Sequence, residues 1–526
     1  MSKQIKKIVI VGGGSAGWMT AATLIARLKG RDITLIESPN IPTIGVGEAT
    51  LAFFNQWLRL LGIKDTDFMK HCDATYKLSI RFTDFYKKGS GSFHYPFGAD
   101  NVDGNYAGKN DWFIKKMFYP DTPLSDYADC IYPVMALVNQ NKMSENLDWK
   151  LPCYNFKSDS AYHFDAVKFA IWLKTHYALP RGVKNIIAEV KDIQINEDGI
   201  EYLQLDDGQK IEADLFIDCT GWRSILYSKF DVPFLSLSNI LPNNSAWVSP
   251  VPYKDKRKQL VSYPDCHAIG NGWVWTTPIW SRIGTGYVYS DKYIDDEGAL
   301  QEFKDHLQSK GLLNEEQKFR NIKFRVGCYE RLWYKNVVPI GLSAGFIEPL
   351  EGNGLYSVHI FLLKLVRTLN RDTEEFCVNS FDKDSYTLSC RQDFKGFTEF
   401  VALHYALSHR DDTQYWRDVC KREYSEFLYN LNNTPHSDLF KYTALSKFDF
   451  NEFDNTGINC IAPGLNYFPT DKDLVDYHVN DETVYKNSLK AASRLNKKKE
   501  MWNEIVKDEP FLYDYLKEKI YYDEER

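Results

Sequence analysis

The chain has 526 residues, of which 44% are hydrophobic and 26% charged, and 64 Lys and Arg against 71 Asp and Glu give a formal net charge of −7. This length predicts two or three domains or sub-domains, and the composition is that of an ordinary globular protein. The sequence has no basic tail or stripe that would suggest a nucleic-acid-binding surface.

The cysteines and apolar runs bear on the compartment. Ten Cys are scattered and none forms a C-x-x-C pair, which predicts reduced thiols without a zinc site or a disulfide framework. The N-terminus has no apolar signal core, and no run reaches the roughly 18–20 apolar residues of a membrane helix. We therefore expect a cytoplasmic protein, in the host cytoplasm if the gene is phage-encoded, with no membrane or nucleic-acid partner.

The first elements along the chain predict a strand, a helix and a second strand. They are strand Ile8–Val11, helix Thr20–Leu28 and a strand that ends at Glu37. Within the intervening turn, Gly12 allows a tight bend, Gly14 lets a pyrophosphate approach the backbone, and Gly17 lets helix and strand pack closely. The helix N-terminus attracts phosphate, and Glu37 accepts hydrogen bonds from a ribose diol. The pattern predicts that the chain binds a dinucleotide, either FAD or NAD.

Two later segments favour FAD. In "ADLFIDCTGWRS" (213–224), the apolar strand Leu215–Ile217 runs into Asp218, Thr220 and Gly221, an arrangement similar to a strand-to-turn element of FAD-dependent oxidoreductases. In "NVVPIGLSAGFIEPLEGNG" (336–354), a further apolar strand leads through small residues into a helix. Together with the first unit, these segments predict one discontinuous FAD-binding fold.

The remaining chain predicts an inserted sheet and a helical C-terminal region. We expect a discontinuous FAD-binding module over 1–370, interrupted by substrate-side sheet segments at about 60–160 and 225–330. Residues 371–526 are expected to form a mainly helical sub-domain that covers the substrate, with residues 400–431 and most of 487–526 helical. Within it, 451–469 is rich in Gly, Asn and Pro and is predicted to be a loop.

One strand makes the resemblance to a known family specific. Trp273-x-Trp275 followed by Pro278 resembles the W-x-W-x-I-P signature of flavin-dependent halogenases, which include the tryptophan halogenases; Thr277 stands where Ile is usual. In that family the signature is proposed to crowd the flavin and discourage monooxygenation. Two tryptophans on one strand face are also what a simple core would contain.

Further segments resemble the same family in the same order. They are "IPTIGVGEATL" (41–51), similar to the loop that straps over the flavin; "DATYKLSIRF" (73–82), similar to the segment that bears the family's essential lysine; "PLEGNG" (349–354), similar to the family's P-L-E-S-T-G; and "HYALSHRDDTQYWR" (404–417), similar to a helix in the family's C-terminal sub-domain. The resemblance implies an α/β (α+β) fold with a Rossmann-like FAD module of the p-hydroxybenzoate hydroxylase type.

Site residues carry over onto matching positions. The resemblance assigns Lys77 and Glu351 as catalytic, the backbone N–H groups of Asn353 and Gly354 as the halide site, and Tyr95 and Phe97 as substrate contacts. The cofactor-binding positions are Gly12, Gly14, Ser15, Ala16, Gly17, Glu37, Gly47, Glu48, Ala49, Thr50, Gly221, Gly341 and Leu350. No metal is expected. Glu351 is also what an ordinary helix start would contain.

The resemblance also implies a mechanism. A separate flavin reductase supplies reduced FAD, dioxygen forms a C4a-hydroperoxide, and halide attack on its distal oxygen gives hypohalous acid. The acid reaches Lys77, which polarises it by hydrogen bonding or forms a haloamine. An electron-rich arene is then halogenated, and Glu351 accepts the ring proton or holds the electrophile.

Two departures from the family pattern concern specificity. Gly352-Asn353 replaces Ser-Thr beside the glutamate, from which we expect bromide or iodide to be preferred over chloride. Ile458-Asn459 replaces the aromatic pair with which tryptophan halogenases grip the amino acid. We therefore expect an indole- or phenol-type arene rather than free tryptophan.

Two other function classes are left open. A flavin monooxygenase would commonly have Gly-Asp where this chain has Gly341-Leu342, and would lack the lysine and the tryptophan pair. A non-catalytic flavoprotein would have no reason to retain both Lys77 and Glu351. The oligomeric state, including a homo-oligomer, is left open.

Overall fold

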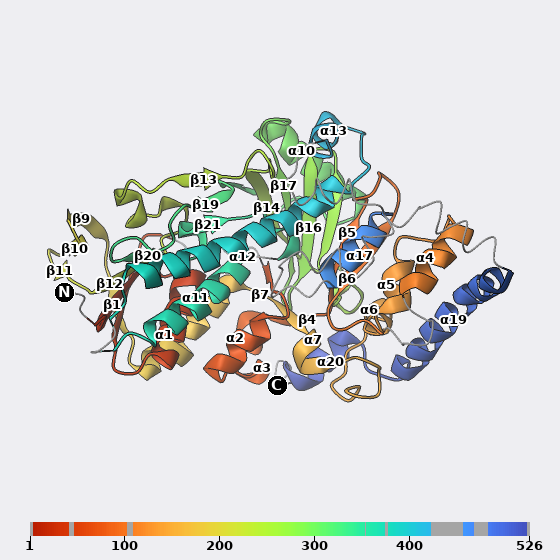
Figure 1. Cartoon of the computed structure of the whole chain (residues 1–526), viewed down its shortest axis with the longest axis horizontal. Coiled ribbons are helices and arrows are strands. Elements are labelled where there is room, and N and C mark those ends of the chain that lie inside the picture. Colours follow the sequence, from red (N-terminus) through yellow and green to blue (C-terminus); the bar gives the residue numbers. More distant parts are fainter. Residues whose placement is uncertain are drawn as a thin grey trace. The chain divides into compact units, whose positions relative to one another are not determined.

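The structure is a computed structural model that describes residues 4–41, 47–101, 109–352, 354–373, 377–421, 456–467 and 482–522. The chain divides into two units, each assembled from three segments (Figure 1). The first unit comprises Met1–Ala74, His163–Ser245 and Ile322–Phe397. The second comprises Thr75–Tyr162, Ala246–Asn321 and Thr398–Arg526.

A parallel five-stranded sheet forms the centre of the first unit. Its order is β20 (Val337–Pro339), β12 (Leu215–Asp218), β1 (Lys7–Val11), β2 (Asp32–Glu37) and β8 (Lys184–Ile187). The central strands are apolar and buried nearly throughout, as parallel strands covered on both faces must be. This sheet with its flanking helices confirms the predicted α/β fold.

Helix α1 (Ser15–Arg27) packs on the sheet and on α11 (Tyr356–Leu369). It begins five positions before the predicted Thr20, because Gly14 takes the extended N-cap conformation directly after the glycine turn. Its buried face includes Trp18, Met19 and Leu24.

The other first-unit strands form small antiparallel sheets. One is β9 (Val190–Asn196), β10 (Gly199–Leu205) and β11 (Lys210–Ile211), and another is β13 (Phe234–Ser236), β19 (Gly327–Tyr329) and β21 (Gly345–Phe346). Strand β3 (Glu48–Ala49) pairs with β7 (Ala161–Phe164). The remaining helices and turns are α2 (Phe54–Leu61), α3 (Asp65–Phe68), η1 (Lys70–Cys72), α8 (Ala166–Trp172), η2 (Leu173–Ala178), η3 (Leu179–Arg181), η4 (Gly221–Arg223), η5 (Tyr227–Lys229), η6 (Gly341–Ser343) and η7 (Pro349–Glu351).

A larger mixed sheet forms the centre of the second unit. From one edge to the other its order is β18 (Arg320–Lys323), β14 (Ser245–Val251), β17 (Ile283–Tyr289), β16 (Gly272–Pro278), β15 (Asp265–Ile269), β5 (Ser79–Thr83) and β6 (Ser92–Pro96). Strands β15 and β5 pair in parallel, whereas β15 with β16, β16 with β17 and β5 with β6 pair antiparallel. Helix α10 (Asp296–Ser309) covers part of it through Phe303 and Leu307, which pack against Tyr287.

Most of the other described elements of the second unit are helices. They are α4 (Lys109–Phe118), α5 (Asp126–Ile131), α6 (Met135–Asn139), α7 (Phe156–Asp159), α9 (Lys256–Gln259), α13 (Gln414–Val419), α17 (Thr456–Gly464), α19 (Glu482–Val506) and α20 (Leu512–Lys519), with the short strand β4 (Thr75–Lys77). Helix α12 (Ser380–Ala406) contributes to both units.

The C-terminal predictions are partly confirmed. Helices α19 and α20 confirm the predicted helical end, and α12 and α13 confirm helix before 421 with a break between Ala406 and Gln414. The predicted loop over 451–469 is wrong for Thr456–Gly464, which form α17. Residues 422–455 and 468–481 lie outside the described residues.

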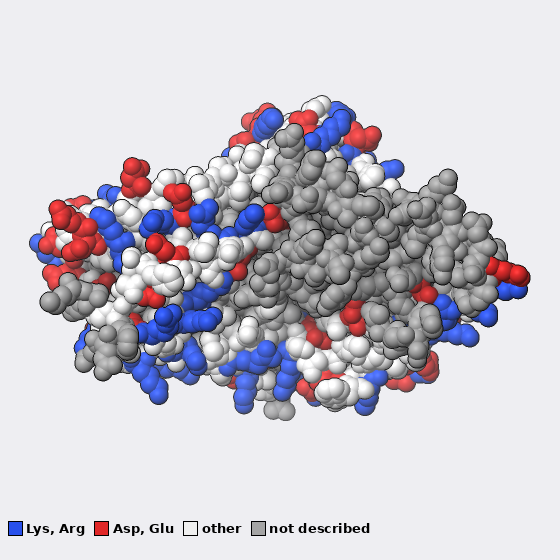
Figure 2. All heavy atoms as spheres, in the orientation of Figure 1, with Lys and Arg blue, Asp and Glu red and all other residues white. Residues whose placement is uncertain are grey.

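Charged side chains of both signs are interspersed on the face in Figure 2, and Lys and Arg predominate at its lower left, where Figure 1 places α1. Among the described residues, no helix is long and apolar enough to cross a membrane.

Candidate active site

The glycine turn after β1 leaves no room for side chains. Gly12 has φ +120°, and a Cβ there would lie 2.3 Å from the carbonyl oxygen of Cys219. A Cβ on Gly17 would lie 1.8 Å from the carbonyl oxygen of Gly12. The turn and the first turn of α1 therefore meet backbone to backbone, which is the close packing that a pyrophosphate-binding turn needs.

The start of α1 is fixed from two sides. Ser15 donates its hydroxyl proton to the Ala166 carbonyl at 3.0 Å. A Cβ on Gly341, which has φ +67°, would lie 2.8 Å from the Cβ of Ala16. The first turn of α1 contains no acidic residue, so its N–H groups are available to an anion.

Glu37 ends β2 and lies beside the glycine turn. A Cβ on Gly13 would be 2.3 Å from Glu37 Oε2. The same carboxylate is ion-paired with Lys174, and Trp18 Nε1 donates to it at 3.4 Å. The side chain that is predicted to accept the ribose hydroxyls is therefore already held near the turn.

Asp218, at the end of β12, organises the second predicted FAD element. It accepts hydrogen bonds from the backbone N–H groups of Thr220, Leu226 and Tyr227, each at 2.9 Å. Ser343 also donates its hydroxyl to Asp218, at 3.0 Å. One buried carboxylate thus joins the turn after β12, where Gly221 has φ +70°, to the turn after β20.

The predicted strap over the flavin is described from Gly47 onward, since 42–46 lie outside the described residues. Gly47 has φ +83°. Glu48 and Ala49 form β3, opposite Phe164 and His163 of β7, and Thr50 is buried. The glycine turn with the start of α1, the segment Gly47–Thr50 and the turns after Asp218 and at Gly341 offer bare backbone and oriented N–H groups and fit an FAD.

The predicted catalytic glutamate closes a short 3₁₀ turn, η7. Leu350 and Glu351 are buried in it, and Gly352 follows with φ +68°. Because that conformation is left-handed, glycine suits this position better than the serine usual in the family pattern. Asn353 lies outside the described residues.

Helix α11 begins at Tyr356, later than the predicted helix start. The carboxyl group of Glu48 lies over the preceding backbone, since a Cβ on Gly354 would be 3.4 Å from Glu48 Oε2. Burial and then the charge of Asp165 raise the pKa of Glu48 to about 7. His359, one turn into α11, is buried, and burial lowers its pKa to about 3.

Lys77 lies at the end of β4, in the second unit. Its side chain is buried, and its ammonium is 5.0 Å from the ring centre of Phe97. The neighbouring backbone is fixed, because Phe97 N–H donates to the Leu78 carbonyl at 2.8 Å. A buried ammonium against an aromatic face is stabilised by the ring quadrupole.

The signature strand β16 is tied to the lysine strand. Thr75 donates its hydroxyl to the Pro278 carbonyl at 2.8 Å. Trp273 is buried and its indole N–H has no hydrogen-bond partner among the described residues. Trp275 is partly exposed, and its ring packs where a side chain on Gly286 would stand.

The predicted substrate aromatics form an edge-to-face group. Tyr95 and Phe97 have ring centres 5.8 Å apart, and Tyr95 and Phe400 5.9 Å apart. Helix α17 packs beside them, with Gly464 against Phe93. The side chains of Ile458 and Asn459 lie outside the described residues.

The structure thus brings the predicted residues together in two groups. The flavin-binding residues, Glu351 and Gly354 belong to the first unit, whereas Lys77, Tyr95, Phe97 and the tryptophan pair belong to the second. Each group is internally fixed by the contacts above. That Glu351 and Lys77 face one arene stays a prediction.

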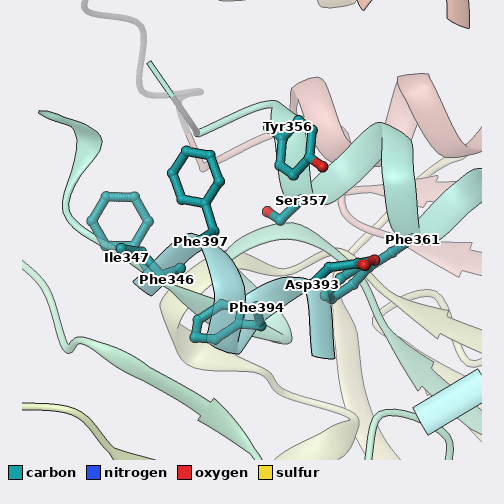
Figure 3. Close-up of a pocket in the computed structure, with 8 residues that line it drawn as sticks. All are labelled: Phe346, Ile347, Tyr356, Ser357, Phe361, Asp393, Phe394 and Phe397. Atoms are coloured by element: carbon teal, nitrogen blue, oxygen red, sulfur yellow. The ribbon is translucent and has the colours of Figure 1, made fainter. Parts of the chain in front are cut away.

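A small pocket lies in the first unit beside the start of α11 (Figure 3). The rings of Tyr356, Phe394 and Phe397 surround it, with Ser357 and Asp393 as polar groups. Its volume of about 20 Å³ suits one water molecule. It is too small for an indole or phenol and is not an arene site.

Sequence reasoning missed Glu348. This carboxylate is as buried as Glu351, three positions later, and accepts a hydrogen bond from Asn243 Nδ2 at 2.5 Å. The two glutamates of "FIEPLEGNG" were a visible signal, but Asn243 is distant in sequence and only the fold brings it there.

Comparisons with known proteins agree with this geometry. Residues 7–480 match the Tryptophan halogenase family. A relative from Kutzneria sp. (strain 744), the 7-chloro-L-tryptophan 6-halogenase KtzR, is 34% identical over 79% of this chain and 82% of its own length.

Solved structures are similar along nearly the whole chain. The apo structure of VirX1 is 36% identical with a TM-score of 0.86, covering 98% of this chain and 99% of that one. BrvH, a flavin-dependent halogenase from Brevundimonas sp. BAL3, is 28% identical with a TM-score of 0.81, covering 98% and 99%.

Proposed function

The chain belongs to the tryptophan halogenase family, and we propose that it halogenates an electron-rich arene of the indole or phenol type, with bromide or iodide preferred over chloride. It is a flavin-dependent halogenase that uses FADH₂, dioxygen and halide, and it needs a separate flavin reductase. Its substrates are aromatic compounds.

The first unit would hold the cofactor through its bare backbone and one carboxylate. The glycine turn and the N-terminus of α1 would take the pyrophosphate, Glu37 the ribose hydroxyls, and the strap at Gly47–Thr50 and the turns at Gly221, Gly341 and Leu350 the rest of the flavin. When bound in its reduced form, FAD with dioxygen supplies the oxidising equivalent that converts halide into an electrophile.

Lys77 and Glu351 would perform the proton chemistry. The Lys77 ammonium donates a hydrogen bond that polarises the electrophile, and its surroundings exclude water because the side chain is buried. Glu351 accepts the proton that the arene loses on regaining aromaticity. Burial of both side chains suits this role, since electrostatic interactions are stronger away from water.

The turn after Glu351 supports the proposed halide preference. Gly352 removes a side chain that the family pattern places there, and Gly354 carries none that would crowd an anion at its N–H. A larger, softer halide gains most from this space. Competition between equal concentrations of two halides tests it: we expect the brominated product to exceed the chlorinated one, and a chlorinated excess would contradict the preference.

The substrate proposal rests on Tyr95 and Phe97, which hold an edge-to-face pair beside Lys77, and on Ile458-Asn459 in place of an aromatic pair. KtzR acts, by its name, on 7-chlorotryptophan. For this chain we propose a more open site without an amino-acid grip, covered by the mainly helical region 371–526.

The observation that carries the function is Lys77, buried against Phe97 within a chain of this family. The test is an assay with separately reduced FAD, dioxygen, each halide in turn and a panel of indoles and phenols, read by mass spectrometry. We expect halogenated product. Oxygenated product would favour the aromatic monooxygenase, and flavin oxidation without product a non-catalytic flavoprotein.

A further inference from the structure

We propose that Glu48 controls halide binding through its own protonation: its neutral form tolerates an anion at the Gly354 N–H, and its charged form repels that anion. The inference rests on the proposed function, since it takes the Gly354 backbone as part of the halide site. It adds a residue of the strap to that site and makes halide affinity dependent on pH.

The geometry places this carboxyl group beside the proposed anion. An added Cβ on Gly354 would be in van der Waals contact with Glu48 Oε2, at 3.4 Å. Glu48 is held there because it lies in β3, where it pairs with Phe164 of β7. Since that Cβ position is one bond from the Gly354 Cα, Glu48 Oε2 lies within about 5 Å of this Cα. The charge on Glu48 therefore acts on an anion at the neighbouring N–H across a short, partly buried gap, where like charges repel.

The surroundings of Glu48 favour its neutral form. Asp165 directly follows Phe164, the strand partner of Glu48, and its carboxylate charge caps α8 by accepting hydrogen bonds from the N–H groups of Val167 and Lys168. Burial and this charge both raise the pKa of Glu48, to about 7. Glu48 keeps some accessible surface, but the two causes act in the same direction.

The other titratable groups on the adjoining elements do not supply a compensating cation to Glu48 in the described contacts. His163 lies on β7 and is buried, and His359 on α11 is neutral at ordinary pH because burial lowers its pKa to about 3. Lys168, on α8, is ion-paired with Asp73 at 2.6 Å. Glu351, on η7, contributes a further carboxyl group.

Halide affinity should fall as pH rises. Below about pH 7 Glu48 is mostly neutral and halide binds; above it, each further unit of pH leaves about tenfold less of the neutral form. By reciprocity, halide binding near this pH must draw a proton onto the protein. A carboxyl group without this coupling would give neither effect.

The experiment measures the KM for bromide from about pH 6 to about pH 9 at constant ionic strength, with saturating reduced FAD and arene. For the wild type we expect KM to rise by about tenfold per pH unit above about pH 7 while kcat at saturating bromide changes much less. Glu48→Gln should keep a low and flat KM. The control Glu302→Gln removes a partly exposed carboxylate on α10 and should keep the wild-type profile.

A second measurement needs no turnover. Bromide is titrated calorimetrically into the FAD-loaded protein near pH 7 in two buffers of different ionisation enthalpy. Proton uptake in the wild type that is absent from Glu48→Gln supports the inference. Should Glu48→Gln fail to fold, Glu48→Asp keeps the acid on a shorter side chain and should shift the KM profile toward lower pH.

The outcomes separate the two claims. Halogenation with a bromide KM that does not change with pH, or with equal slopes in wild type and Glu48→Gln, overturns the role of Glu48 and leaves the proposed function standing. Absence of halogenated product from the wild type with every halide overturns both.

Discussion

At the scale of single residues, the proposed chemistry depends most directly on Lys77. Its buried ammonium faces Phe97, and we expect Lys77→Ala to lower the halogenation rate by at least about 100-fold, because the residue that polarises the electrophile is lost. Oxidation of reduced FAD should persist. The matched control is Lys87→Ala, an exposed lysine whose ammonium lies 5.2 Å from the Tyr86 ring centre; equal losses in both variants would contradict the role of Lys77.

Glu37 offers a test of cofactor binding that does not need turnover. It is predicted to accept two ribose hydrogen bonds, and bonds to a charged group contribute about 1.5–3 kcal/mol. Glu37→Ala should therefore raise the FAD dissociation constant by about tenfold or more, measured by fluorescence titration. Asp32→Ala, at the other end of β2, removes an exposed pair with Lys184 and should leave it nearly unchanged.

Residues that local motifs specify were predictable, and those that depend on the fold were not. Lys77 and Glu351 stand in short segments whose order along the chain carries the information. The bond between Asn243 and Glu348 and the approach of Glu48 to Gly354 join residues far apart in sequence. No local pattern encodes such contacts, so they could only be read from the structure.

At the scale of elements, the glycine turn and α1 form one packed unit. Gly17→Ala would put a methyl group 1.8 Å from the Gly12 carbonyl oxygen, so we expect α1 to be displaced and FAD binding and thermal stability to fall together. Gly30→Ala is the control: with φ +70° and no atom within 4 Å, it should cost only about 1 kcal/mol. Thermal melts with and without FAD would measure both. A Gly17 variant that behaves like the Gly30 variant would contradict the packing argument.

Among the helices and strands, tertiary packing overrides local secondary-structure propensity in one segment. The periodic strands β1, β2 and β12 were predictable because buried parallel strands are continuous apolar runs. Thr456–Gly464 was not, since its Gly, Asn and Pro content is typical of a loop. In the structure it is a helix whose Gly464 lets it approach Phe93 so closely that a Cβ would lie 2.2 Å from the ring. Tertiary packing, which composition does not express, selects the helix.

At the scale of the whole molecule, the long helix α19 is fastened within the second unit by Asp126. This carboxylate binds Lys115 of α4 at 2.7 Å and Lys499 of α19 at 2.9 Å. Burial alone would raise the pKa of Asp126, but the hydrogen bonds from the two lysines outweigh burial and hold it below its ordinary value. The stabilisation is therefore present above the ordinary pKa of an aspartate and is lost as pH falls through the lower, folded value.

We expect the protection of the α19 amides against hydrogen exchange to stay constant near neutral pH. It should fall only below about pH 4, where Asp126 becomes protonated and the helix opens. Asp126→Asn should open α19 at neutral pH, because two partly buried lysines lose their anion. Glu504→Gln, which removes an exposed pair with Lys507 at the C-terminal end of α19, serves as the control. Unchanged protection of α19 in Asp126→Asn would show that its other contacts, among them the pair between Arg494 and Asp111, hold the helix without Asp126.

The discontinuity of the first unit has a consequence for biosynthesis. Strand β1 pairs with β2 soon after both leave the ribosome, but its other neighbour, β12, begins only at Leu215, and β20 follows at Val337. At ordinary translation speeds of roughly 5–20 residues per second, β1 presents an open apolar edge for about 10–40 s. The nascent chain is thus exposed to wrong strand pairing for that interval, so ample chaperones during expression should raise the yield of folded enzyme, and a fragment that stops before β20 should not fold.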